Sequence, residues 1–146
     1  MQGRTILYTG AAGGLGHQTT LNFLSRGATV VAVDHDDTKI AALTSAAAGI
    51  PTGRLMVTRS DLFNLEGFRA TIRARLEETG GYDVVINNAA IYPTKSFEEF
   101  TIEDHQRVQR INVDAGIVAV QEALPGMKAK GFGRIINIAS ITLSGG

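Results

Sequence analysis

A glycine-rich turn near the start of the chain has the composition of a phosphate-binding loop. The segment Thr9-Gly10-Ala11-Ala12-Gly13-Gly14-Leu15-Gly16 follows a short apolar run and precedes a helical pattern. Glycines let the backbone approach a phosphate, and the unpaired N–H groups and dipole of a helix N-terminus attract its negative charge. The spacing Gly-x-x-x-Gly-x-Gly predicts a diphosphate site, although a tight turn without a ligand would also use these glycines.

A carboxylate follows this turn at the end of a β-branched run. Asp34 comes directly after Thr29–Val33, roughly 20 residues beyond the turn, as in dinucleotide-binding sites. A carboxylate there can accept hydrogen bonds from both hydroxyls of an adenosine ribose, and it would repel a 2′-phosphate. Residues 35–37 add two further acids and no arginine. We therefore expect NAD rather than NADP as the cofactor. The alternative role of Asp34 as a helix cap is weaker, because residues 36–38 can already supply a cap.

Apolar runs that predict strands alternate strictly with helical patterns along the chain. The expected strands cover residues 6–8, 29–33, 54–58, 84–86 and 134–138, and the expected helices cover 15–25, 38–48, 66–78 and 102–130. Asp37 or Thr38 is the expected cap of the second helix. This alternation predicts a doubly wound, Rossmann-like α/β fold with a parallel sheet, strand order 3-2-1-4-5 and helices on both faces. We expect one domain over residues 1–146, with ligands at the carboxyl ends of the strands.

The composition narrows the class of protein further. Hydrophobic residues make up 44% and charged residues 19% of the chain, and its formal net charge is zero. With no cluster of Lys or Arg, neither nucleic acid nor a membrane is expected as a partner. The chain contains no cysteine, which excludes disulfides and thiolate metal sites, and no metal is expected. Without a visible signal peptide or membrane-spanning run, we expect a cytoplasmic protein.

The ordered set of motifs resembles that of the classical short-chain dehydrogenase/reductase family. The glycine turn is similar to the family's cofactor motif, and Asp34 stands where its NAD-preferring members carry an acid. Ser60-Asp61-Leu62 resembles the segment that contacts adenine. Asn87-Asn88-Ala89-Ala90 resembles an Asn-Asn-Ala-Gly motif with Ala in the last place. Asn112 and Ser140 fall where the family has its catalytic Asn and Ser.

The resemblance implies an NAD-dependent oxidoreductase that interconverts a small alcohol and a carbonyl compound by hydride transfer. It implies that Asp61 accepts a hydrogen bond from the adenine amino group and that the N–H of Leu62 donates to a ring nitrogen. Residues 88–90 would lie against the nicotinamide ribose, while Asn87 is expected to tie neighbouring strands together. The expected cofactor-binding residues are Gly10, Gly13, Gly14, Leu15, Gly16, Asp34, Asp61, Leu62, Asn88, Ala89 and Ala90.

The same resemblance assigns the catalytic candidates. Ser140 would bond the substrate oxygen, and Asn112 would hold a water in a proton relay. From the residues alone, Asn112 could instead satisfy a backbone group and Ser140 could be a strand-end hydroxyl. The family's acid/base pair, Tyr-x-x-x-Lys, would follow Gly146, so we expect this chain alone to be inactive. Tyr92, with Lys95 three residues later, is a poor substitute because the spacing is one residue short and no helix is expected there.

Two other functions stay open at this point. The chain could be a catalytically inactive module that binds NAD or another adenine nucleotide. A response-regulator-like signalling domain would share the layered architecture but would need an acidic metal pocket. Because Asp34 and Asp61 accompany a glycine turn suited to phosphate, the signalling function is disfavoured.

The expected helix 102–130 is apolar on more than one side. Its apolar residues include Val108, Ile111, Ile117, Val118, Val120, Leu124 and Met127. One side can pack on the sheet, and in the family the other side meets the helix that bears Tyr and Lys. We therefore expect an exposed apolar patch, with homo-oligomer formation through this helix or poor solubility.

Overall fold

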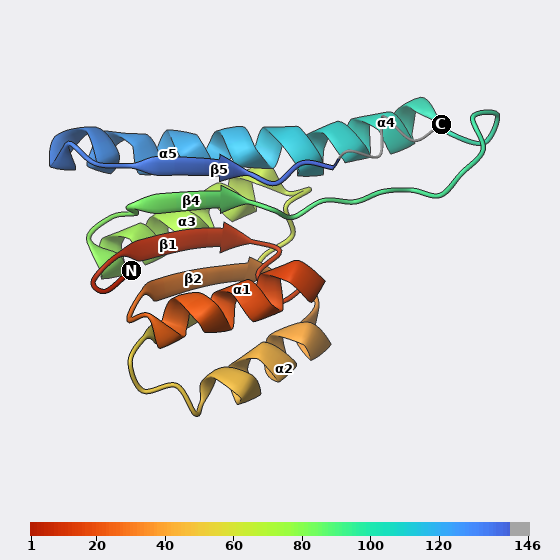
Figure 1. Cartoon of the computed structure of the whole chain (residues 1–146). Helices are drawn as coiled ribbons and strands as arrows, with labels where there is room; N and C mark the ends of the chain where they lie inside the picture. Colours follow the sequence, from red (N-terminus) through yellow and green to blue (C-terminus); the bar gives the residue numbers. More distant parts are fainter. Residues whose placement is uncertain (141–146) are drawn as a thin grey trace.

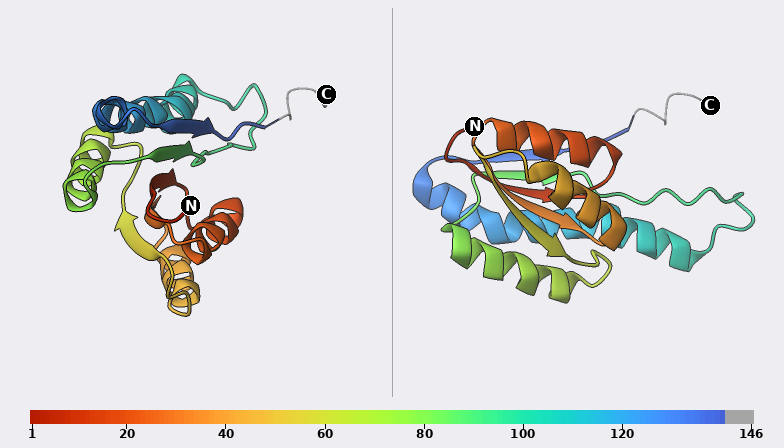
Figure 2. Two further views of the ribbon diagram at one scale, coloured as in Figure 1. Left: turned by 60° about the vertical axis from the view of Figure 1, so that its left-hand side comes forward. Right: turned by 90° about the horizontal axis from the view of Figure 1, so that it is seen from below.

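A computed structural model describes residues 1–140 of the chain, and the expected domain's last residues, 141–146, lie outside the described part. Five parallel strands form one sheet in the order β3-β2-β1-β4-β5, as the sequence predicts (Figures 1 and 2). The strands are β1 (Thr5–Thr9), β2 (Thr29–Asp34), β3 (Arg54–Arg59), β4 (Val84–Asn87) and β5 (Arg134–Asn137). The helices are α1 (Gly14–Ser25), α2 (Asp37–Ala47), α3 (Leu65–Thr79), α4 (Ile102–Gln109) and α5 (Ala115–Lys130), with a π-helical turn, η1 (Arg110–Asp114), between the last two.

Helices cover both faces of the sheet (Figure 2). On one face, Ile6 and Tyr8 of β1 pack with residues of α1 and α2, and on the other face Leu7 packs with residues of α3 and α5. Successive residues of a strand point to opposite faces, so a strand between two helical layers is apolar at every position. This explains the uninterrupted apolar runs that the sequence contains.

The start of α2 differs by one residue from the sequence prediction. The cap is Asp36, not Asp37 or Thr38, and its carboxylate accepts a hydrogen bond of 3.1 Å from the backbone N–H of Lys39. Asp36 has an extended backbone, with φ −92° and ψ 106°, which lets its side chain reach the third N–H of the helix. Asp37 is already helical and cannot perform this role.

The long segment 102–130 is helical, but it is not one uninterrupted α-helix. The π-helical turn at Arg110–Asp114 lies between α4 and α5. A π turn adds a residue to the helical repeat and often occurs at functional sites. Thr101 and Asp104 begin the segment with a reciprocal capping box. Within the described residues, no helix is long and apolar enough to cross a bilayer.

Candidate functional site

Two glycines of the first turn are required by close backbone packing. Gly10 has φ +66°, and a Cβ added there would lie 2.9 Å from the Cα of Ala89. A Cβ at Gly16 would lie 2.8 Å from the Cα of Ala11. Gly14 is different, because a Cβ there would meet nothing within 4 Å. The turn therefore packs tightly against the chain on one side and is open on the other.

The carboxylate of Asp34 joins the end of β2 to this turn. Its Oδ2 accepts a hydrogen bond of 3.0 Å from the N–H of Ala12. Its Oδ1 accepts bonds from the N–H groups of His35 and Asp36, at 2.8 and 3.2 Å. The Asp34 side chain is 8% exposed, so it is a nearly buried negative group at the carboxyl edge of the sheet.

The end of β4 is locked to the end of β1 by side chains. Thr9 Oγ1 accepts hydrogen bonds from the N–H groups of Asn88 and Ala89, at 3.1 and 3.2 Å. In return, the Asn88 amide donates to the carbonyls of Thr9 and Gly10, both at 3.2 Å. These bonds hold residues 88–90 against the glycine turn.

A cavity of about 290 Å³ collects all eleven cofactor-binding residues expected from the sequence. It extends from the glycine turn past Asp34 and the Asp61-Leu62 segment to residues 88–90. Five further residues line it that the sequence argument did not single out. They are His35, Lys39, Ile91, Arg107 and Ile111. Arg107 and Ile111 stand four apart, and this helical spacing was the available signal that they share a face.

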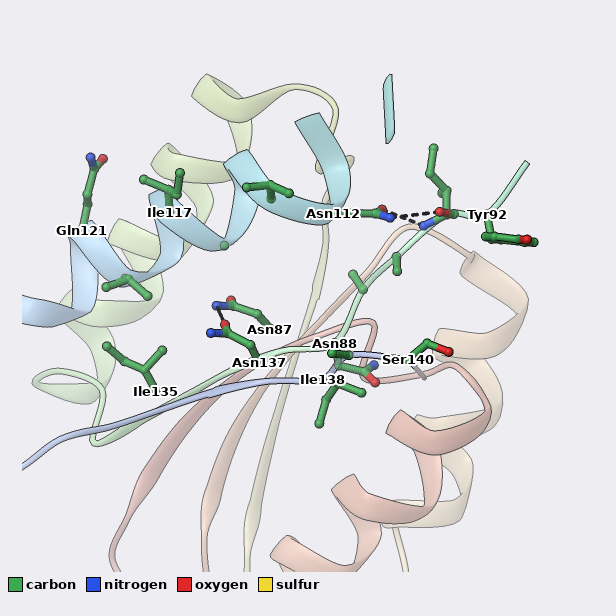
Figure 3. Close-up of a pocket in the computed structure, with 17 residues that line it drawn as sticks. Asn87, Asn88, Tyr92, Asn112, Ile117, Gln121, Ile135, Asn137, Ile138 and Ser140 are labelled. Carbon is green, nitrogen blue, oxygen red and sulfur yellow. Dashed lines mark hydrogen bonds between the residues drawn. The ribbon is translucent and has the colours of Figure 1, made fainter. Parts of the chain in front are cut away.

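A second cavity of about 870 Å³ contains both catalytic candidates, Asn112 and Ser140 (Figure 3). It lies between the β5 edge of the sheet and the η1–α5 segment, and residues 88–91 line both cavities. A ligand that occupied both cavities would therefore pass along residues 88–91. The two ends of such a ligand would lie near Asp61 and beside Ser140.

The Asn112 side chain bonds to the backbone of Ile91, a residue that lines both cavities. Its Oδ1 accepts a hydrogen bond of 2.9 Å from the N–H of Ile91, and its Nδ2 donates one of 3.0 Å to the Ile91 carbonyl (Figure 3). This agrees in part with the alternative role expected for Asn112, which was to satisfy a backbone group. The partner, however, lies 21 residues away and not in the same helical turn. The π-helical turn thereby anchors the wall that both cavities share.

Comparison with known proteins assigns the family. The family model for short chain dehydrogenases matches residues 4–144. The chain belongs to the short-chain dehydrogenase family. It is 28% identical over 138 residues to a D-beta-hydroxybutyrate dehydrogenase of Rhizobium meliloti, covering 94% of this chain and 54% of that protein. It is 31% identical over 144 residues to a meso-2,3-butanediol dehydrogenase of Serratia marcescens, covering 98% of this chain and 55% of that protein.

Solved structures of short-chain dehydrogenases share the fold. Levodione reductase matches with a TM-score of 0.87 and 27% identity, over 96% of this chain and 55% of that one. A metagenomic short-chain oxidoreductase in complex with NADP matches with a TM-score of 0.88 and 26% identity, over 96% of this chain and 62% of that one. The chain thus spans about half the length of the curated relatives it matches.

The described tyrosines of this short-chain dehydrogenase chain occupy unlike positions. Tyr8 and Tyr82 are buried in the core, and the Tyr82 hydroxyl donates to the carbonyl of Ile72 at 2.5 Å. Burial raises the pKa of Tyr82, which disfavours its use as a base. Tyr92 lies in the loop after β4, is 83% exposed and lines the larger cavity. In residues 1–140, no group of three His, Asp or Glu side chains is placed to hold a metal ion.

Paired amides lie at the base of the larger cavity. Asn87 Nδ2 donates a hydrogen bond of 2.8 Å to Asn137 Oδ1, between two residues that are partners in the β4–β5 register. The expectation that Asn87 ties neighbouring strands is confirmed. A Cβ at Gly116 would lie 3.1 Å from the Asn87 amide nitrogen, so a small residue on α5 makes room for this pair.

Proposed function

We propose that this chain is the cofactor-binding portion of an NAD-dependent short-chain dehydrogenase that interconverts an alcohol and a carbonyl compound. One observation carries the proposal: the eleven residues expected to bind the cofactor line a single cavity at the carboxyl edge of the sheet. The open side of the glycine turn suits a diphosphate, and Asp34 suits a ribose diol. We further propose that residues 1–146 act as one dinucleotide-binding domain.

The preference for NAD over NADP rests on the charges beside Asp34. A 2′-phosphate next to this nearly buried carboxylate would meet like-charge repulsion without full solvent screening. Lys39 lines the same cavity, but its ammonium group lies 3.3 Å from a carboxylate oxygen of Asp36. This pairing offsets the attraction of Lys39 for a 2′-phosphate, and the other basic side chains that line the cavity are His35 and Arg107. The structural relative solved with NADP is a separate protein, 26% identical to this one.

A titration of the purified chain with NAD and NADP tests this preference. We expect NAD to bind at least about tenfold more tightly than NADP. Asp34→Asn should narrow this difference, because an amide keeps an oxygen acceptor for the Ala12 N–H but loses the negative charge. Asp37→Asn is the matched control, since Asp37 is 74% exposed and pairs with Arg59. Equal binding of NAD and NADP by the unaltered chain would contradict the assignment.

The catalytic roles follow the same proposal. Ser140 would donate a hydrogen bond to the substrate oxygen, and Asn112 would support the proton relay from its position on the π-helical turn. When bound, the nicotinamide supplies or accepts the hydride. The substrate-side acid/base pair of Tyr and Lys is not among residues 1–140, so we expect the isolated chain to oxidise no alcohol with NAD. Sustained NADH production by the purified chain would overturn this expectation.

A catalytically inactive NAD-binding or adenine-nucleotide-binding module is the alternative function. It predicts the same cofactor titration, so binding alone does not separate the two. Joining this chain to the remaining half of a short-chain dehydrogenase separates them. Hydride transfer that depends on Ser140 favours the enzyme, while unchanged inactivity of a folded, NAD-binding hybrid favours the module.

We also propose that copies of the chain associate through the α4–η1–α5 segment. Apolar side chains remain exposed there and directly after the neighbouring β5, including Val113 at 47%, Ile117 at 52% and Ile138 at 45%. These residues line the larger cavity, so the apolar patch expected from the sequence lies beside the catalytic candidates.

A further inference from the structure

The loop after β3 carries an aromatic residue, Phe63, whose backbone is held by hydrogen bonds on both sides. The N–H of Phe63 donates to Asp61 Oδ1 at 2.9 Å, and the carbonyl of Phe63 accepts a hydrogen bond of 2.6 Å from Arg110 Nε. These bonds join the Asp61–Phe63 turn to the η1 segment. Phe63 is therefore a fixed platform next to the residues expected to bind adenine.

Two guanidinium groups lie over this ring, but only one of them borders the cavity. The central guanidinium carbon is 4.9 Å from the ring centroid for Arg107 and 5.4 Å for Arg110. Arg107 lines the 290 Å³ cavity together with Asp61 and Leu62, whereas Arg110 does not. Stacking on an aromatic face orients a guanidinium and restricts its motion.

The Arg107 guanidinium has no polar partner among the described residues. Within residues 1–140 it makes no hydrogen bond and no ion pair, and its contact is the Phe63 ring. The Arg110 Nε–H instead donates a hydrogen bond to the Phe63 carbonyl. One helical turn beyond Arg107, Ile111 also borders the cavity and is 8% exposed. This face of the helix thus presents an apolar side chain and a planar cation to the same space.

We propose that Arg107 is a specificity-determining residue that stacks on the adenine base of the cofactor. A planar cation and an aliphatic side chain suit the face of a flat aromatic ring, whose edge Asp61 and Leu62 can bond. The inference rests on the proposed function, because it places the base at the Asp61 end of the cavity. It adds that the face of the base, and not only its edge, is recognised.

Adenosine and AMP are the probes that test this inference, measured by calorimetric titration of the full chain. Arg107→Ala should weaken both about fivefold to tenfold and by equal factors, because the base is common to both. Arg107→Lys should weaken them nearly as much, since an ammonium group keeps the charge but loses the planar stack. Nicotinamide mononucleotide, which lacks adenine, should bind all variants equally.

Arg134→Lys is the matched control, because it is the same exchange at an arginine that lies over another ring, Phe132, at 4.9 Å and lines neither cavity. It should bind adenosine as the unaltered chain does. The inference is overturned if the Arg107 variants bind adenosine normally, if only AMP is weakened, which would indicate a phosphate contact, or if Arg134→Lys has an equal effect. If the unaltered chain binds neither AMP nor NAD, the proposed function itself fails, which is a distinguishable result.

Discussion

Gly14 and Gly16 are neighbours in one turn, yet the structure gives them different roles. Gly16 packs against the backbone of Ala11, while the space around Gly14 is open and belongs to the cavity. The Gly-x-x-x-Gly-x-Gly spacing of the sequence does not distinguish these two glycines. The contacts separate a glycine that the fold requires from a glycine that leaves room for a ligand.

Alanine at Gly16 should therefore lower the stability of the fold, whereas alanine at Gly14 should weaken the binding of NAD. Gly16→Ala should lower the free energy of unfolding by about 1–3 kcal/mol, because its Cβ forces the backbone apart. Gly14→Ala should leave stability within about 1 kcal/mol or raise it, since alanine favours a helix start over glycine. It should weaken NAD about tenfold by filling diphosphate space. Urea unfolding and NAD titration measure both, and normal NAD binding by Gly14→Ala would contradict the assigned phosphate position.

Among the elements, α3 and α5 are joined by one acidic side chain. Glu122 of α5 is 10% exposed and bonds Arg73 Nε at 2.5 Å as well as the Arg69 guanidinium. Burial raises the pKa of Glu122, but the hydrogen bonds and charges of Arg73 and Arg69 outweigh burial and leave the pKa below its ordinary value. This cluster links α3 and α5, which pack on the same face of the sheet.

Glu122→Gln should lower the free energy of unfolding by about 1–2 kcal/mol at neutral pH. Because the pKa of Glu122 is lowered in the folded state, the stabilisation is complete above the ordinary pKa and is lost as the pH falls through the lowered value. The difference between the two proteins should therefore shrink in acid. Glu77→Gln, at an exposed position of α3, is the control and should change little. A difference that is constant with pH would refute the ionic contribution.

For the whole molecule, the sheet ends in a strand whose side chains are all exposed. Every residue of β5 is exposed, and the larger cavity opens between this strand and α5. An apolar surface of this kind promotes association. The apolar surface is thus exposed beside the catalytic candidates Asn112 and Ser140.

We expect the purified chain to sediment as a concentration-dependent oligomer. Replacing Ile117 and Ile138 together with serine should shift it toward monomer, because the change removes apolar area from the exposed surface. Phe97→Ser is the control, since Phe97 is 91% exposed but lies outside the cavity lining. Analytical ultracentrifugation that finds a monomer at every concentration would rule out association through this surface.

The sequence by itself determined the fold and predicted the residues that line the smaller cavity. Strict alternation of strand and helix, the glycine turn and Asp34 are local signals, and local spacing fixes them. Only the tertiary structure decided that Asp36 caps α2, that a π turn interrupts the long helix and that Asn112 bonds Ile91. It also placed Arg107 over Phe63, across 44 positions of the chain (107 minus 63). Contacts at such separations depend on how packed elements meet, and no periodicity in the sequence encodes that geometry.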